Sequence, residues 1–290
     1  MKSLATWLFA TLQYPLPQHA LSRLWLRLSR LQQPWLKDRL IRWFISRFAI
    51  NLDEAANPNP THYPHLNAFF TRALRPDARP LVAESDAVLS PVDAAISQIG
   101  SITGDTLLQA KGHHYTLEAL LTEAEAAAPY RNGAFTTLYL SPRDYHRIHL
   151  PLAGRLRRML HVPGRLFSVN AATTDHVPGL FARNERVICH FDCDHGPFAM
   201  VLVGAMLVGG IETVWHGEVT PPRGRRIGCW DYPEGPIFAR GAEIGRFNMG
   251  STVILLLPPG MARWQPALAP GGRVRMGEAI ATLQSPIEPL

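Results

Sequence analysis

The sequence has few cysteines, few charged residues and no long uninterrupted apolar segment. Its three cysteines, Cys189, Cys193 and Cys229, are too few for a disulfide framework, so we expect a reducing compartment. Only 18% of the 290 residues are charged and 47% are hydrophobic, which excludes wholesale disorder. Arginines interrupt the early apolar runs, and the run at 198–211 is also shorter than the roughly 20 residues of a membrane-spanning helix. No small-residue cleavage site follows the apolar stretch at 4–12, so we predict no signal peptide.

Acidic residues are nearly absent from the first 50 positions, where eight lysines and arginines accompany one acid, Asp38. The remaining 240 residues are almost neutral, although the whole chain carries a net charge of +6. Because the positive charge is confined to one segment, we expect no nucleic-acid partner. Four of the seven tryptophans share this segment: Trp7, Trp25, Trp35 and Trp43.

The basic segment also has helical periodicity. Leucines at 21, 24, 28 and 31 repeat at helical spacing with arginines opposite, and a second apolar face follows Pro34. Basic amphipathic helices with tryptophan are typical of segments that lie on an anionic membrane surface. We predict that residues 1–56 form such a membrane-associating segment. The alternative is a helical layer packed on its own domain or on a second copy.

The composition changes to strands and turns after the Pro/Asn-rich stretch at 57–60. Apolar or β-branched runs bounded by glycine and proline predict strands at 135–140, 187–191, 213–219 and 252–257. The run at 198–211 predicts two buried strands joined tightly, and 270–283 predicts a strand–turn–strand. We expect helices near 65–74 and over 116–128, the second capped by Thr116. The sequence therefore predicts an α+β fold: N-terminal amphipathic helices, then a mainly antiparallel, β-sandwich-like catalytic domain over 57–290.

Three places contain residues suited to catalysis. His146 and His149 lie in a polar loop after an apolar strand, Asp93 stands at the start of an apolar strand, and Ser251 opens another. Taken singly, each is more often structural than catalytic. Together they supply the groups that activate a hydroxyl nucleophile. A membrane-surface Ser–His–Asp lipid hydrolase is therefore one candidate, although the chain has no Gly-x-Ser-x-Gly motif. A membrane scaffold without enzymatic activity is another.

A metal site is not expected. The stretch at 189–195 holds four cysteine and histidine side chains, but strand alternation puts Cys189 and Cys193 on one face and His190 on the other.

The tetrad Met-Gly-Ser-Thr at 249–252 resembles the processing site of the pyruvoyl-dependent phosphatidylserine decarboxylases, which usually reads Leu-Gly-Ser-Thr. The resemblance extends in order through most of the body. The segments that carry it are FFTRALRP (69–76), SPVD (90–93), KG (111–112), YLSPRDYHRIHLP (139–151), HVPG (161–164), FARNER (181–186) and IETVW (211–215). The chain departs from the family pattern at Met249, where leucine is usual, and at Ala94, where glycine is usual.

This resemblance implies a proenzyme that cleaves itself between Gly250 and Ser251 into chains 1–250 and 251–290. Asp93, His149 and Ser251 would form the self-cleavage triad, with His149 oriented by Asp93 as the base. Ser251 would become a covalent pyruvoyl group that forms a Schiff base with phosphatidylserine, so neither pyridoxal phosphate nor a metal is expected. His146 is the candidate proton donor for the decarboxylation to phosphatidylethanolamine and CO₂.

The resemblance also implies partners and a location. The two cleavage products would stay together as a heterodimer, whose further dimerisation is left open. The substrate lipid and an anionic surface place the enzyme peripherally on the cytoplasmic side of the cell membrane. Arg147, Arg165 and Arg186 are available to hold the lipid phosphate, and the sequence does not rank them.

Overall fold

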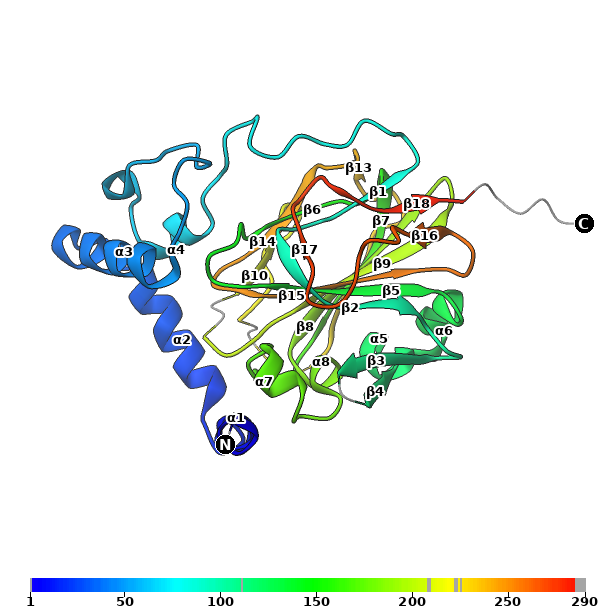
Figure 1. The fold of residues 1–290 in the computed structure, drawn as a ribbon, viewed down its shortest axis with the longest axis horizontal. Coiled ribbons are helices and arrows are strands. Elements are labelled where there is room, and N and C mark those ends of the chain that lie inside the picture. Colours follow the sequence, from blue (N-terminus) through cyan, green and yellow to red (C-terminus); the bar gives the residue numbers. More distant parts are fainter. Residues whose placement is uncertain (1, 111, 208–209, 222–223, 225, 285–290) are drawn as a thin grey trace, which may run out of the picture.

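A computed structural model describes residues 2–110, 112–207, 210–221, 224 and 226–284; the side chains of residues 2, 3 and 251 lie outside the described part. Helices of the first 70 residues lie along one side of a β-rich body (Figure 1). They are α1 (Lys2–Thr11), α2 (Gln18–Ser29), α3 (Pro34–Phe48) and, after the short turn η1 (Pro60–His62), α4 (Leu66–Phe70). None of the described helices is long and apolar enough to cross a bilayer.

A nine-stranded sheet forms the centre of the body, and its strand pairs are antiparallel. In spatial order the strands are β12 (Gly228–Asp231), β7 (Gly154–Val162), β8 (Arg186–Cys193), β9 (Gly196–Val203), β15 (Ser251–Leu257), β5 (Ala134–Leu140), β2 (Ala94–Ser101) and β17 (Arg273–Val274), with β13 (Ile237–Phe238) also pairing with β7. The predicted α+β fold with mainly antiparallel strands is confirmed.

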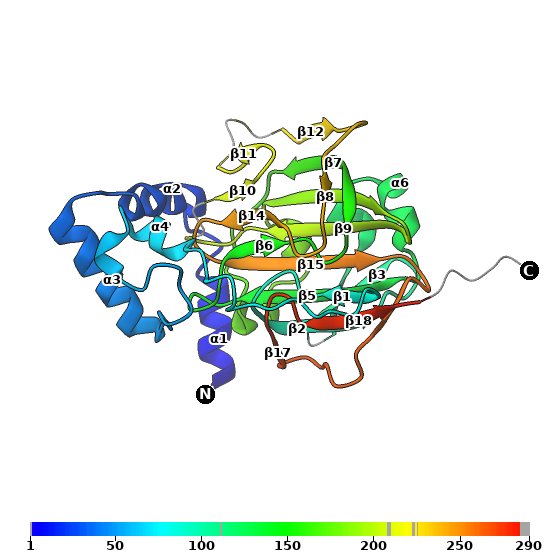
Figure 2. The ribbon, with the colours of Figure 1, turned by 90° about the horizontal axis from the view of Figure 1, so that it is seen from above.

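Both faces of this sheet are covered. Smaller sheets pack on one face: β1 (Ala87–Leu89), β18 (Ala279–Leu283) and β16 (Ala262–Trp264) in one, and β11 (Gly217–Glu218), β10 (Ile211–Thr213), β14 (Glu243–Phe247) and β6 (Arg147–His149) in another. The other face is covered by the pair β3 (Thr106–Ala110) and β4 (His113–Thr116) and by α5 (Leu117–Leu121), α6 (Ala124–Ala127), η2 (Ala128–Tyr130), α7 (Ala171–Thr174) and α8 (Leu180–Arg183). Figure 2 shows the layers from above.

Strand β15 is the best-buried element of the body. It pairs with β5 along one edge and with β9 along the other. Val253, Leu255 and Leu257 belong to the core on one face, and Ile254 and Leu256 to the core on the other. The alternation follows from the two-residue repeat of a strand. A continuous apolar run is therefore needed here, because neither face meets water.

Several predicted elements differ from the observed ones. The helix expected at 116–128 begins as predicted, with the Thr116 hydroxyl accepting from the Ala119 N–H, but Thr122 adopts a left-handed backbone that ends α5. Only the middle of the 65–74 segment is helical, as α4. The strand expected at 213–219 is wrong, because β10 turns back on β11. The second strand of the 198–211 run begins only at Ile211 and joins another sheet, and residues 208–209 lie outside the described part. Strands β17 and β18 pair with other strands rather than with each other.

The arm, residues 1–56, is attached to the body largely through polar side chains. Gln13 Oε1 accepts from the Ser168 N–H and Gln18 Oε1 from the Leu166 N–H, each at 2.8 Å. The buried residues of α2 are Gln18, Ser22, Leu26 and Ser29, so its leucine stripe does not face the body. Large exposed side chains of the arm include Leu4, Trp7, Leu8, Phe9, Leu12, Leu24, Leu28, Leu31, Trp35 and Trp43. The arm therefore packs on its own domain and still presents an apolar surface.

The end of the arm also contacts the segment before β15. Ile41 and Phe44 of α3 share a buried cluster with Phe69 and Phe70 of α4 and with Met249. The cluster crosses the expected boundary at residue 56. It gives the segment just before Ser251 a wall made of the arm helix α3 and of α4.

We expect Leu255→Ala to lower the free energy of unfolding by about 2–5 kcal/mol, because it leaves a cavity in a strand that is paired on both edges. Leu108→Ala is the matched control, since Leu108 is exposed on β3. Urea unfolding of both variants checks this. Equal and small decreases in the free energy of unfolding of the two variants would contradict the central position of β15.

Candidate functional site

The two expected histidines bracket strand β6 and are both buried. His146 lies 2.7 Å from the Asp144 carbonyl oxygen through Nδ1. Because a carbonyl only accepts, Nδ1 carries the proton and Nε2 carries the lone pair. Nε2 is buried and has no hydrogen-bond partner among the described residues. It lies 3.9 Å from the position that a Cβ on Gly250 would occupy. A free basic nitrogen thus faces the predicted cleavage site.

His149 is held on both sides. Its Nδ1 donates to the Gly241 carbonyl oxygen at 2.8 Å, and its Nε2 lies 3.0 Å from the Tyr145 hydroxyl, which donates to it. The ring is therefore oriented with its acceptor nitrogen toward Tyr145.

Burial lowers the pKa of His146 to about 3, and the charge of Arg72 acts in the same direction. Burial also lowers the pKa of His149, against the opposing effects of the Gly241 hydrogen bond and the Glu243 and Asp93 charges. Both imidazoles are therefore neutral near pH 7 and able to accept a proton.

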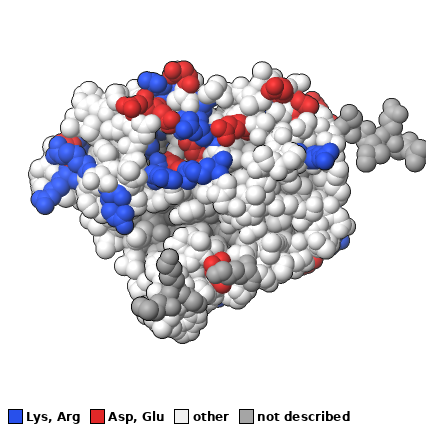
Figure 3. Space-filling model, in the orientation of Figure 1, with Lys and Arg blue, Asp and Glu red and all other residues white. Residues whose placement is uncertain are grey.

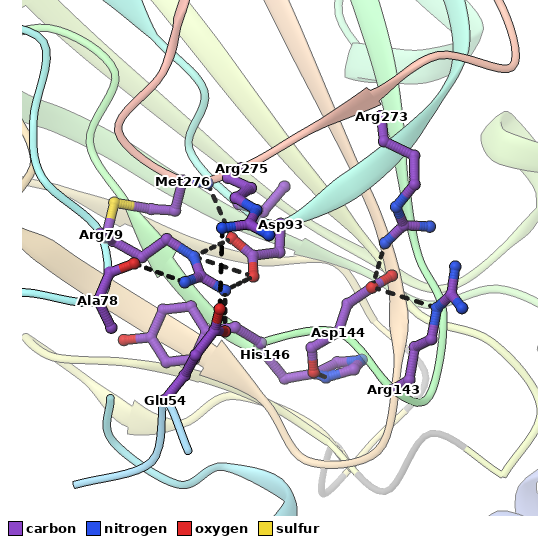
Figure 4. Close-up of polar contacts among 12 residues, drawn as sticks. Glu54, Ala78, Arg79, Asp93, Arg143, Asp144, His146, Arg273, Arg275 and Met276 are labelled. Carbon is purple, nitrogen blue, oxygen red and sulfur yellow. Dashed lines mark hydrogen bonds and ion pairs between the residues drawn. The ribbon is translucent and has the colours of Figure 1, made fainter. Parts of the chain in front are cut away.

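Asp93 precedes β2 and is buried in an ion-pair network (Figure 4). Arg79 donates to both of its carboxylate oxygens and also to Glu54, at 2.7 Å. The Met276 N–H donates to Asp93 Oδ1 at 2.9 Å, because pairing of β17 with β2 brings that backbone alongside. The Asp93 charge acts on His149, but among the described contacts the two share no hydrogen bond. Asp93 and His149 are thus close enough to interact through charge, and Arg79 holds the Asp93 carboxylate where the histidine was expected.

The backbone before β15 is strained. Met249 has a φ of 101° and Gly250 a φ of 81°, a region that only glycine enters easily. The Ser251 backbone pairs with Leu140 of β5, and the Ser251 hydroxyl lies outside the described part of the chain. The next hydroxyl, Thr252 Oγ1, is buried without a described partner. The strained backbone at Met249 and the unpartnered polar atoms near Gly250 fit a bond that reacts.

A cavity of about 480 Å³ opens beside this site. Figure 3 shows basic and acidic side chains gathered around a hollow on this face. Its wall includes Asp93 and Tyr145, which contact or act on His149, and Asp144, whose carbonyl holds His146. The arm contributes Ala49, Asn51 and Glu54.

The three arginines expected to be available for a phosphate already have partners. Arg147 bonds Glu243, Arg165 bonds the Tyr14 carbonyl, and buried Arg186 bonds carbonyl groups of 119–120, 182 and 184. The sequence analysis did not identify Arg72 or Arg79, which line the cavity. Arg72 lies within the 69–76 motif that carries the family resemblance, and this was the feature of the sequence that could have pointed to it.

No group of three or more histidine, cysteine, aspartate or glutamate side chains with metal-binding geometry occurs within the described ranges. The alternation expected in the 189–195 stretch is observed, because Cys189 and Phe191 of β8 face one core. The Cys189 thiol is buried, which raises its pKa.

Comparison with known proteins identifies the family. The family model described as phosphatidylserine decarboxylase matches residues 66–282, and one described as PSD matches residues 8–49. The phosphatidylserine decarboxylase proenzyme of Methylococcus capsulatus is 53% identical over 284 residues, covering 97% of this chain and 99% of that protein. Proteins of the same name from Azotobacter vinelandii and Alkalilimnicola ehrlichii are 53% and 57% identical, covering 94% and 85% of this chain and 97% and 87% of their own lengths. The chain therefore belongs to the phosphatidylserine decarboxylase family.

Proposed function

We propose that this protein cleaves its own Gly250–Ser251 bond, converts Ser251 to a pyruvoyl group and then decarboxylates phosphatidylserine to phosphatidylethanolamine. The observation that carries the proposal is the unpartnered His146 Nε2 beside Gly250, at a backbone held with positive φ. The relatives are named as proenzymes, which supports self-processing. They give no support to the lipid-hydrolase alternative.

Self-cleavage begins when the Ser251 oxygen attacks the Gly250 carbonyl carbon and its proton passes to a base. We assign that base to His149, whose Nδ1–H is anchored by Gly241 and whose Nε2 accepts. The negative charges of Glu243 and Asp93 favour the imidazolium that forms. Asp93 thus assists through its charge in this arrangement. The proton then goes to the Ser251 nitrogen as the peptide bond becomes an ester.

Loss of the Ser251 Cα proton then breaks the Cβ–O bond of the ester, leaving a carboxylate on Gly250 and a dehydroalanine at position 251. Water adds to the imine form of this enamine, ammonia leaves, and a pyruvoyl group remains. The positive φ of Met249 costs about 1–3 kcal/mol, and cutting the chain next to it would relieve that strain. Because β15 stays paired with β5 and β9, the chains 1–250 and 251–290 should remain associated as a heterodimer.

The pyruvoyl group supplies a carbonyl that forms a Schiff base with the lipid amine and accepts the electrons released with CO₂. The protein's own contribution is a base that takes the proton given up by the lipid ammonium as the Schiff base forms, and returns it to the carbon that has lost CO₂. His146 Nε2 faces Gly250 from a buried position, with its ring against Phe70 at a centroid distance of 4.0 Å. We assign the proton transfer of the decarboxylation to His146.

We further propose that the arm holds the enzyme peripherally on the cytoplasmic face of the cell membrane. Trp35 and Trp43 are 70% and 51% exposed, in a segment with eight basic side chains. Such a surface combines apolar burial with attraction to anionic lipids.

Intact mass under denaturing conditions tests the two histidine roles. Ser251→Ala and His149→Ala should remain full-length, because a serine hydroxyl is a weak nucleophile without a base. His146→Ala should cleave at Gly250–Ser251 and then turn over about 10²–10⁴-fold more slowly, because it lacks a positioned acid.

His146 Nε2 lies beside Gly250, so the opposite assignment, with His146 as the base of self-cleavage, is also tested by these variants. Full-length His146→Ala together with cleaved His149→Ala would transfer the role of base to His146. An uncleaved wild-type protein that hydrolyses lipid esters would replace the whole proposal.

The buried histidines should make the protein sensitive to acid. Their folded-state pKa values lie below the ordinary 6.5, so the unfolded chain takes up protons first as the pH falls. Stability should therefore decrease below pH 6.5 by about 1.4 kcal/mol per pH unit for each such histidine, down to about pH 3 for His146. Urea unfolding of the Ser251→Ala protein between pH 7.5 and 4.5 measures the slope. Adding His146→Phe should make it shallower, whereas adding His195→Phe, at an exposed position, should not.

Replacing Trp35 and Trp43 together by alanine should weaken sedimentation with anionic vesicles by about 10- to 100-fold, because apolar burial in the interface is lost. Ile237→Ala, an equally exposed position on the body, is the control. Binding should also fall with salt, since Arg and Lys attract anionic lipid. Unchanged sedimentation of the double variant would move the membrane contact elsewhere.

A further inference from the structure

Arg72 is a buried cation with unused hydrogen-bond donors. It follows α4 and is only 4% exposed. Its Nε and Nη1 atoms are buried and have no hydrogen-bond partner in the described part of the chain. The flat face of the guanidinium rests on Phe69, with Cζ 5.3 Å from the ring centroid. Stacking occupies the face and leaves the N–H edge free for in-plane bonds to an anion.

The other arginines of the cavity already have carboxylate partners. Arg79 is shared by Asp93 and Glu54, and Arg143 and Arg273 both contact Asp144. Arg275 lies 3.8 Å from Glu54, and its N–H bonds Glu278. The arginines and acids that line the cavity number five and four, which leaves one positive charge in excess. We attribute that excess to Arg72, because the other four arginines contact carboxylates. Leaving such a cation buried and unpaired is costly, and a bound anion would offset that cost.

We propose that Arg72 holds the phosphodiester of the lipid headgroup. This inference rests on the proposed function and adds the residue that recognises the substrate's phosphate. The cavity of about 480 Å³ is large enough for a headgroup, and its wall includes residues of the arm and Tyr145, whose hydroxyl bonds His149. Arg72 is also close enough to His146 for its charge to lower the pKa of that imidazole. Phe70, two residues before Arg72, packs against the His146 ring at a centroid distance of 4.0 Å, so a phosphodiester on Arg72 would bring the headgroup near that histidine.

The chemistry favours the phosphodiester over the substrate carboxylate as the group on Arg72. The carboxylate must lose its charge when it leaves as CO₂, so an arginine bound to it would stabilise the ground state and slow the reaction. The phosphodiester keeps its charge throughout. An arginine on it therefore stabilises substrate and transition state equally and changes KM rather than kcat. Its planar donor edge also suits two phosphate oxygens at once.

The test compares two soluble amines that differ in the phosphate: glycerophosphoserine and O-methylserine. Each is trapped on the 251–290 fragment with cyanoborohydride and measured by mass, using only protein that has cleaved. Wild type should trap glycerophosphoserine more efficiently. In Arg72→Gln that preference should shrink by about 10- to 100-fold, as expected when a charge-assisted hydrogen bond is lost, while trapping of O-methylserine stays the same. Arg72→Lys should recover part of the preference, and Arg157→Gln, a surface variant paired with Asp192, should keep all of it.

The outcomes separate this inference from the proposed function. Wild type that traps neither amine removes the pyruvoyl proposal itself. Wild type that traps both, with an Arg72→Gln protein whose trapping falls equally for both amines or not at all, leaves Arg72 a purely structural residue and overturns the inference.

A measurement on wild type covers the case in which Arg72→Gln fails to accumulate. Glycerol phosphate should raise the KM for glycerophosphoserine without changing kcat, because both need the same cation. Absence of this competition at tens of millimolar contradicts the assignment. Inorganic phosphate should compete more weakly; equal competition would make the cavity a site for free phosphate and overturn the headgroup assignment.

Discussion

The two-sided pairing and two-sided burial of β15 constrain the rest of this molecule. A strand held by β5 and β9 and covered on both faces has no freedom to shift. The chain must therefore enter it at one fixed point, and the positive φ angles of Met249 and Gly250 are where it does so. This turn into the rigid strand places Gly250 beside His146, whose Nε2 lies 3.9 Å from the position that a Cβ on Gly250 would occupy. The same rigidity explains how a chain cut at that point can keep its shape.

The buried charges are arranged around this fixed strand. Asp93 and Glu54 share Arg79, whose side chain is only 7% exposed, and the Met276 N–H adds a further bond to Asp93. This network connects the arm, the start of β2 and a segment that follows the cleavage site. Arg72 stands beside it with unused donors. Arg79 links parts of the protein through its ion pairs with Asp93 and Glu54, and we assign Arg72 to the substrate.

The arm uses one face to pack on the body and leaves another face exposed. Buried glutamines and serines attach it to the body, and α3 and α4 form the wall behind Met249. Several of its leucines and tryptophans, among them Leu24, Leu28, Trp35 and Trp43, remain exposed. The arm also lines the cavity through Ala49, Asn51 and Glu54, so the segment that we expect to meet lipid reaches the site where we propose that the lipid reacts.

The sequence by itself determined the α+β class, the central apolar strand at 252–257 and the helical basic arm, because these depend on periodicities and compositions within short segments. Its motifs also indicated the family and brought His146, His149, Asp93 and Gly250 into consideration. Only the tertiary structure decided their partners. Asp93 bonds Arg79 because the backbones around positions 79 and 276 converge on it, and no local pattern encodes that convergence. The orientation of α2 was decided in the same way: its buried face is set by hydrogen bonds to the body, which override the leucine stripe. The sequence does not distinguish Arg72 from other arginines. Its tertiary surroundings do, because they bury the guanidinium and leave Nε and Nη1 without an acceptor among the described residues.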